Sequence, residues 1–214
     1  MGYLSSLEIR TRGAVVLLLV TLFMCGCSQG ASRLQQQSLS PGEAAAKAIE
    51  TYDENGDGIL NPDELTGSPS LLAALGKIDT DGDGQMTESE IAARLNQWVD
   101  SRIALFTVPC QVYLDGQPLS EATVRFEPEP FLGNSFQVVE GMTTRKGGIK
   151  FQALPGMPAG GLPPGLYRIR VTKMVDGKQI IPSLYNEQTI LGQEIANDAE
   201  GMERTLEFRL SKNN

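Results

Sequence analysis

Oxygen-bearing side chains recur at the same intervals in two twelve-residue stretches, 53–64 and 79–90. The first, third, fifth, ninth and twelfth positions each carry a carboxylate, an amide or a hydroxyl. Calcium prefers six to eight such hard oxygen ligands, and the backbone carbonyl at the seventh position supplies one more. We therefore expect each stretch to wrap around one calcium ion, with a bidentate glutamate at its twelfth position. The expected ligands are Asp53, Asn55, Asp57, Ile59, Asn61 and Glu64 in the first stretch and Asp79, Asp81, Asp83, Gln85, Thr87 and Glu90 in the second.

A glycine stands at the sixth position of each stretch, where the chain must turn sharply. Gly58 and Gly84 suit a backbone with positive φ, which a Cβ atom would resist. An acidic surface turn is the alternative for one such stretch, but two complete matches 26 residues apart favour calcium loops. Both stretches match the EF-hand calcium loop in full. Leu60 and Met86, at the eighth positions, should join the two loops in a short two-stranded bridge.

Helical patterns flank both stretches and complete an expected helix–loop–helix pair over 40–103. Ser40 and Glu43 form a predicted capping box before the first helix, with a proline at the first helical position. Thr87 and Glu90 should cap the helix that leaves the second stretch, which carries an apolar stripe at helical spacing. The compact arrangement resembles extracellular bacterial EF-hand pairs.

The period of the apolar pattern changes to two after residue 107. Alternating runs separated by turn residues predict seven short strands over 107–214, a number typical of an antiparallel sandwich. The chain is therefore expected to be an α+β protein of two domains, a helical EF-hand pair followed by an antiparallel seven-stranded β-sandwich. The expected strands cover 108–114, 122–127, 136–139, 149–153, 166–174, 178–181 and 205–210.

Three segments of the second half resemble transthyretin-like (prealbumin-like) and carboxypeptidase regulatory-like domains. Residues 112–126, which contain an Asp-Gly turn, resemble the first hairpin of those domains, and 141–151 resembles a further segment with its glycine turn. Residues 164–171 resemble their PGxYxVxV strand. The resemblance implies a domain that is usually a non-catalytic appendage. The enzymatic relative of the urate pathway relies on histidines and a carboxy-terminal tyrosine motif, which this sequence lacks, so we expect no enzymatic activity.

The 214-residue chain has a net charge of −8 and no histidine. Negative charge excludes a surface that binds nucleic acid through phosphates, and the lack of histidine excludes the common hydrolytic triads. Residues 41–102 hold 13 acidic and 4 basic side chains, so a net charge of −9 belongs to the calcium loops and their helices. Cys110 lies in an apolar strand pattern, which predicts a buried structural thiol. Charges at alternate strand positions are expected to face solvent as cross-strand partners: Arg125, Glu127, Arg168 and Arg170.

Two arginines precede an apolar run at 14–24, the pattern of a secretory signal. The following Met-Cys-Gly-Cys resembles a bacterial lipobox, which implies a signal peptide at 1–26 and a diacylated Cys27 as the first mature residue. An uncleaved anchor is the alternative, but a helical run of this length covers roughly half of a hydrocarbon core of about 30 Å. The polar stretch 27–39 is predicted to be a flexible tether.

These features together predict a lipid-anchored protein of the bacterial cell envelope, on the outer membrane or facing the periplasm, with a structural or adhesive role. Calcium would act as a clamp that stabilises the fold, and its removal should loosen 41–102 while the β half stays folded. The alternative is a calcium-dependent recognition module that docks an envelope protein or a glycan. The short helix after the first stretch favours the clamp. The sequence indicates no oligomeric state.

Overall fold

The computed structural model describes residues 36–155 and 160–213. The predicted signal peptide and most of the predicted tether lie outside these residues. The end of the tether lies against the helices, because Gln36 Nε2 donates a hydrogen bond of 2.7 Å to the Trp98 carbonyl. Within the described ranges, no helix combines the length and the apolar character needed to cross a membrane.

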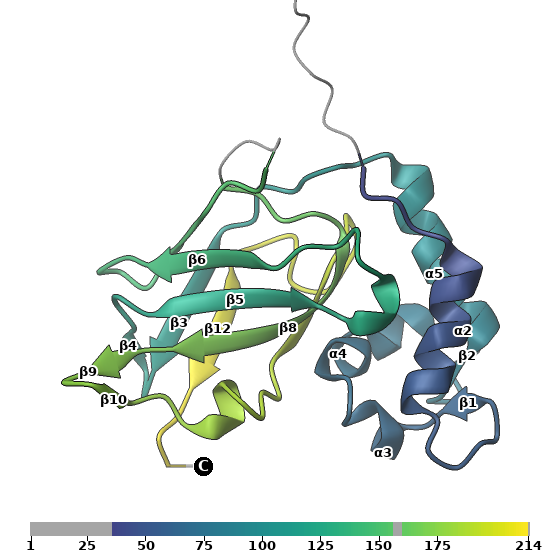
Figure 1. The fold of residues 1–214 in the computed structure, drawn as a ribbon, viewed down its shortest axis with the longest axis horizontal. Helices are drawn as coiled ribbons and strands as arrows, with labels where there is room; N and C mark the ends of the chain where they lie inside the picture. Colours follow the sequence, from purple (N-terminus) through teal and green to yellow (C-terminus); the bar gives the residue numbers. More distant parts are fainter. Residues whose placement is uncertain (1–35, 156–159, 214) are drawn as a thin grey trace, which may run out of the picture. The chain divides into compact units, whose positions relative to one another are not determined.

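Helices and a two-stranded bridge form the first half of the described chain, which we call the helical part (41–101; Figure 1). The helices α2 and α5 pack against each other, and their buried residues recur at the helical period. Ala45 and Ala48 are buried on α2, as are Ile91 and Leu95 on α5. The elements are α2 (Pro41–Tyr52), β1 (Ile59–Leu60), α3 (Pro62–Leu65), α4 (Pro69–Ile78), β2 (Met86–Thr87) and α5 (Glu88–Ser101).

The two predicted capping boxes have different outcomes. The box at the start of α2 is wrong, because the side chain of Ser40 makes no capping hydrogen bond. Pro41 at the first helical position fixes φ near the helical value, so the helix begins without that contact. The box at α5 is confirmed, since the Thr87 hydroxyl accepts from the Glu90 N–H and the Glu90 carboxylate accepts from the Thr87 N–H.

Two sheets form most of the second half, which we call the β part (110–210; Figure 1). The larger sheet is antiparallel with the order β11-β8-β5-β6-β7, and the smaller has the order β12-β3-β4. The predicted combination of helices and antiparallel sheets is therefore confirmed. The elements are β3 (Cys110–Leu114), β4 (Gln117–Pro118), β5 (Thr123–Pro128), η2 (Pro130–Leu132), β6 (Val139–Thr143), β7 (Ile149–Phe151), β8 (Gly165–Thr172), β9 (Met174–Val175), β10 (Lys178–Gln179), η3 (Ser183–Tyr185), β11 (Gly192–Ile195) and β12 (Leu206–Leu210).

The strand pairing departs from the predicted seven-stranded, fully antiparallel arrangement. β12 pairs with β3 in parallel, in a register that begins at Leu206 opposite Cys110. Parallel neighbours need a long connection, and here it is all of the chain between the two strands. The sequence pattern does not predict β11, because Gly-Gln-Glu-Ile lacks apolar alternation. The predicted strand at 136–139 contributes only Val139 to β6.

The two sheets enclose an apolar core around the ring of Phe126. This ring meets those of Phe151 and Tyr167, in the same sheet, edge to face at centroid distances of 5.4 and 6.0 Å. It meets Phe208 of β12, in the other sheet, at 5.9 Å. Edge-to-face aromatic pairs add to the stabilisation from burial, so Phe126 ties both sheets together.

A second apolar cluster joins the helical part to the β part. Phe131 of η2 and Leu166 at the start of β8 are buried among the residues of α2, α4 and α5. The predicted domain ranges, 40–103 and 107–214, coincide with the change from helix to strand. Both nevertheless lie in one compact unit, Leu34–Asn214, and share this core.

A close backbone contact between α4 and β11 gives a test of this packing. A Cβ atom at Gly192 would come within 2.1 Å of the Pro69 carbonyl group. Gly192→Ala should therefore lower the free energy of unfolding by about 1–3 kcal/mol. Gly76→Ala is the matched control, because Gly76 lies on α4 in open space and alanine favours a helix by up to about 1 kcal/mol. Urea unfolding followed by circular dichroism measures both changes, and an unaltered midpoint for Gly192→Ala would contradict the packing of α4 on β11.

Candidate metal centre

Residues 79–90, which we call loop two, bring three carboxylates together. Oxygen atoms of Asp79, Asp81 and Asp83 all lie within 4.8 Å of one another. The Asp79 carboxylate accepts hydrogen bonds of 2.7 and 2.9 Å from the backbone N–H groups of the two glycines in the turn. Asp81 and Asp83 each accept one from the N–H group two residues further along, at 3.2 and 2.8 Å. The backbone therefore curls around the carboxylate cluster.

Residues 53–64, which we call loop one, repeat this pattern of hydrogen bonds. The Asp53 carboxylate accepts from two glycine N–H groups at 2.7 and 2.8 Å. Asn55 and Asp57 each accept from the N–H group two residues further along, at 2.8 and 3.0 Å. The same bonds thus occur at the same positions in two segments that share their oxygen-bearing positions and two glycines but differ elsewhere. This repetition indicates that the spacing of the oxygen-bearing side chains sets the conformation of both loops.

The glutamates at the twelfth positions close both loops. Glu64 accepts two bonds from N–H groups near the start of loop one and a third, of 3.0 Å, from the Asn61 N–H. Glu90 accepts from the N–H groups of Thr80 and Thr87, both at 2.9 Å. Burial raises the pKa of the Glu90 carboxyl, but these hydrogen bonds outweigh burial and lower the pKa to about 2. Glu90 is therefore an anion at neutral pH.

Glycines provide the sharp turns of both loops. Gly58 and Gly84 have φ values of 85° and 83°, which confirms their predicted conformation. Gly56 and Gly82, at the fourth positions, also have positive φ, at 77° and 79°. The sequence analysis missed these two, although the glycine shared by both fourth positions was a usable signal.

The two loops are joined side by side through β1 and β2. Leu60 pairs with Met86, as predicted, and both side chains are fully buried. The same bridge places Ile59 opposite Thr87, so the seventh position of loop one faces the ninth position of loop two. Gln85, the seventh residue of loop two, directly precedes β2. The bridge therefore holds the two loops against each other.

The donor set of the loops fits a hard divalent cation. Among the described residues, none of the loop carboxylates predicted as ligands lies within ion-pair distance of a lysine or arginine. A carboxylate has about four lone-pair sites, so the N–H bonds leave capacity for a cation. The donors are all oxygen atoms, the ligands that calcium prefers, whereas structural zinc sites use sulfur and imidazole nitrogen.

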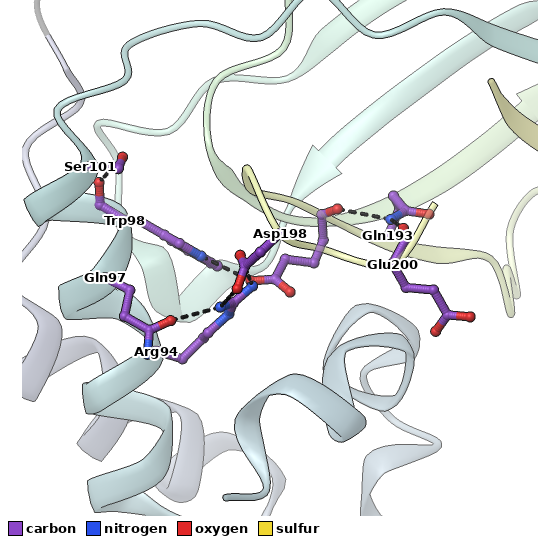
Figure 2. Close-up of polar contacts among 8 residues, drawn as sticks. Arg94, Gln97, Trp98, Ser101, Gln193, Asp198 and Glu200 are labelled. Atoms are coloured by element: carbon purple, nitrogen blue, oxygen red, sulfur yellow. Dashed lines mark hydrogen bonds and ion pairs between the residues drawn. The ribbon is translucent and has the colours of Figure 1, made fainter. Parts of the chain in front are cut away.

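An ionic cluster with a buried Arg94–Glu194 pair joins α5 to β11 and the segment after it (Figure 2). Arg94 is 3% exposed, and its Nε donates a hydrogen bond of 2.6 Å to Glu194 while its terminal nitrogens donate to Asp198. Trp98 Nε1 donates to the same Glu194 oxygen at 2.9 Å. Figure 2 shows Arg94 and Trp98 reaching from α5 toward Asp198. This cluster was not predicted from the sequence. Its one indication there is Arg94, a charged residue directly before Leu95 of the apolar stripe.

Arg168 is 27% exposed, close to the 29% of Arg170, but it does not form the expected solvent-facing cross-strand pair. Its Nε lies 3.0 Å from the carboxylate of Glu129, which is buried, because residues of the helical part cover this end of the sheet. Arg170 of β8 lies 2.6 Å from the Glu127 carboxylate of β5, a cross-strand pair of the expected kind. Arg125 lies 3.5 Å from Glu127 on its own strand and 3.8 Å from Glu140 of the neighbouring strand β6. Arg168 therefore departs from the expected pattern in its partner and not in its exposure.

Cys110 does not contribute to this centre. Cys110 is buried and free, as predicted, and burial raises the pKa of its thiol to about 12. The thiol is therefore protonated at neutral pH and unsuited to nucleophilic attack. Cys27, the predicted lipidation site, lies outside the described residues.

No protein-family model, no curated protein and no solved structure matches this chain. What the loops can bind therefore follows from their donor atoms and their geometry. The donors are oxygen atoms, the kind of ligand that hard divalent cations prefer.

Proposed function

We propose that loops one and two form an EF-hand pair that binds two calcium ions. The repeated pattern of hydrogen bonds in the two loops is the observation that carries the proposal. Carboxylates held close together without a basic partner repel each other, and a divalent cation relieves that repulsion. The side-chain ligands are those predicted at the first, third, fifth, ninth and twelfth positions, and Ile59 and Gln85 supply backbone carbonyls.

Calcium acts in this proposal as a structural clamp. Extracellular calcium modules bind with dissociation constants of about 0.1–1 mM, so a calcium-rich compartment keeps them occupied. Free calcium at about 100 times the dissociation constant adds roughly 2.7 kcal/mol of stability for each independent site. Sensor proteins instead open a groove rich in methionine. Met86 is the only methionine of residues 41–102 and is fully buried in the bridge between the loops, which favours the clamp over a recognition module.

The wider role is that of a lipid-anchored protein of the bacterial cell envelope. The lipobox-like segment would anchor Cys27 in a membrane, and the calcium-clamped helices would brace the β part for a structural or adhesive task without catalysis. The β part is proposed to be a transthyretin-like sandwich, an interpretation that its two sheets around Phe126 support. Its partner would be an envelope protein or a glycan.

The two sites should differ in affinity. Loop two offers four carboxylate ligands, whereas loop one has neutral Asn55 in place of the second, and more charge favours tighter binding. Glu90→Gln should weaken the tighter step of a calorimetric calcium titration, and Glu64→Gln the weaker step, each by at least about tenfold. Glu88→Gln is the matched control, because Glu88 is an exposed acidic residue of α5 outside the predicted ligand set.

Two results of this titration would contradict the proposal. Absence of calcium binding by the unmodified chain would refute the EF-hand assignment itself. Binding that responds to Glu88→Gln as strongly as to Glu90→Gln would show attraction by general negative charge instead of a built site. A reversed order of the two affinities would leave the sites in place but refute the ranking by charge.

Lipidation is tested by replacing, one at a time, Cys27 and the other cysteine of the Met-Cys-Gly-Cys segment, Cys25. Cys27→Ala should move the protein from the membrane fraction to the soluble fraction, because the thioether that carries the lipid can no longer form. Cys25→Ala is the control and should leave the protein in the membrane fraction. Equal membrane retention of both variants would support an uncleaved anchor and overturn the lipidation site.

A further inference from the structure

The carboxylate of Glu129 is a buried acceptor of hydrogen bonds from the helical part. Glu129 follows the end of β5, and its side chain is 0% exposed. Its Oε2 accepts from the Tyr52 hydroxyl at 2.6 Å. Its Oε1 accepts from the hydroxyls of Ser68 and Ser70 at 2.8 and 2.7 Å. One residue of the β part is therefore bonded to three residues of the helical part.

These partners lie on both sides of loop one. Tyr52 is the last residue of α2, directly before Asp53, the first predicted ligand. Ser68 follows the short helix α3, which contains Glu64, the last predicted ligand. The segment that enters loop one and the segment that leaves it are thus both bonded to the carboxylate of Glu129.

Arg168 of β8 completes the arrangement. Its Nε donates to Glu129 Oε2 at 3.0 Å, and its Nη2 donates to the Tyr52 hydroxyl at 2.9 Å and to the Gly67 carbonyl at 2.7 Å. The Tyr52 ring also meets Phe131 edge to face at 6.2 Å. Glu129, Arg168, Tyr52 and the two serine hydroxyls therefore each have a hydrogen-bond partner within the cluster.

We propose that Glu129 is a positioning residue for calcium binding at loop one. The inference rests on the proposed calcium function. It adds that Glu129, a residue of the β part, influences the calcium affinity of loop one. Calcium affinity in such loops depends on ligand charge and on the rigidity of the site. Glu129 carries no ligand atom, but it holds the two ends of loop one at a fixed separation, so the loop loses less freedom when it binds the ion. By linkage, calcium in loop one must stabilise the Glu129 contacts to the same extent.

The test measures the affinity of each loop separately in the full chain. A Glu90→Gln background weakens loop two and reports loop one, and a Glu64→Gln background does the reverse. Glu129→Gln keeps the size of the side chain but places an amide against Arg168, and Tyr52→Phe removes one hydroxyl only. Glu127→Gln is the matched control, because Glu127 of β5 pairs with Arg170 of β8 and with Arg125 of its own strand. It makes no hydrogen bond or ion pair with the described residues of the helical part.

Calorimetry should show that Glu129→Gln and Tyr52→Phe weaken loop one by at least about fivefold. Both variants should change the calcium affinity of loop two by less than about twofold. Glu127→Gln should change the affinity of neither loop. If Glu129→Gln does not fold, Tyr52→Phe decides the outcome. Unaltered affinity at loop one, or an equal loss at both loops, would overturn the positioning role. Absence of binding by the unmodified chain would instead refute the proposed calcium function, so the two failures are distinguishable.

Discussion

Burial of the Glu129 carboxylate is the constraint on which the arrangement of this protein depends. A charge that leaves water must be matched by hydrogen bonds and an opposite charge, or the fold becomes strongly destabilised. The partners of Glu129 come from α2, from the turn before α4, from α4 itself and from β8. Removing one partner of such a pair costs about 3–5 kcal/mol, so the helices and the sheet can separate only at a large expense of free energy.

A second buried carboxylate, that of Glu194, imposes a similar constraint on another helix. Glu194 of β11 accepts from Arg94 and Trp98 of α5, the helix that leaves loop two. The helix that precedes loop one, α2, is therefore bonded to the carboxylate of Glu129. The helix that follows loop two, α5, is bonded to the carboxylate of Glu194. The shared apolar cluster around Phe131 and Leu166 fills the space between these polar contacts. This arrangement changes the expectation for calcium removal, which should disturb β8 and β11 as well as the helices.

The local features of the metal centre could be predicted from the sequence, because short-range geometry determines them. The spacing of Asp79, Asp81 and Asp83, the turn at Gly84 and the cap at Thr87 involve residues a few positions apart. The alternating burial along β3 and β12 was equally accessible. Such patterns report which face of a strand is buried, but they do not report the direction of its neighbour, which is why the parallel pairing was missed.

The contacts between the helical part and the β part could not be predicted, because they join residues far apart in the chain. Arg168 and Arg170 occupy equivalent alternating positions on β8, and only tertiary structure shows that Arg168 donates hydrogen bonds to the helical part. Arg94 and Glu194 are similarly 100 residues apart. Charged residues are mostly exposed, so a sequence pattern predicts a surface location for them. They are buried only where the fold brings an oppositely charged partner to them.

Hydrogen exchange of the full chain, with calcium and with chelator, tests the central claim that calcium stabilises helices and sheet as one structure. The account predicts that chelation lowers the protection of amides in α2 and α5 and also in β8 and β11. Loss of protection confined to 41–101, with β8 and β11 unchanged, would contradict the coupling between the two parts. Protection that is the same in both conditions would contradict the calcium clamp itself.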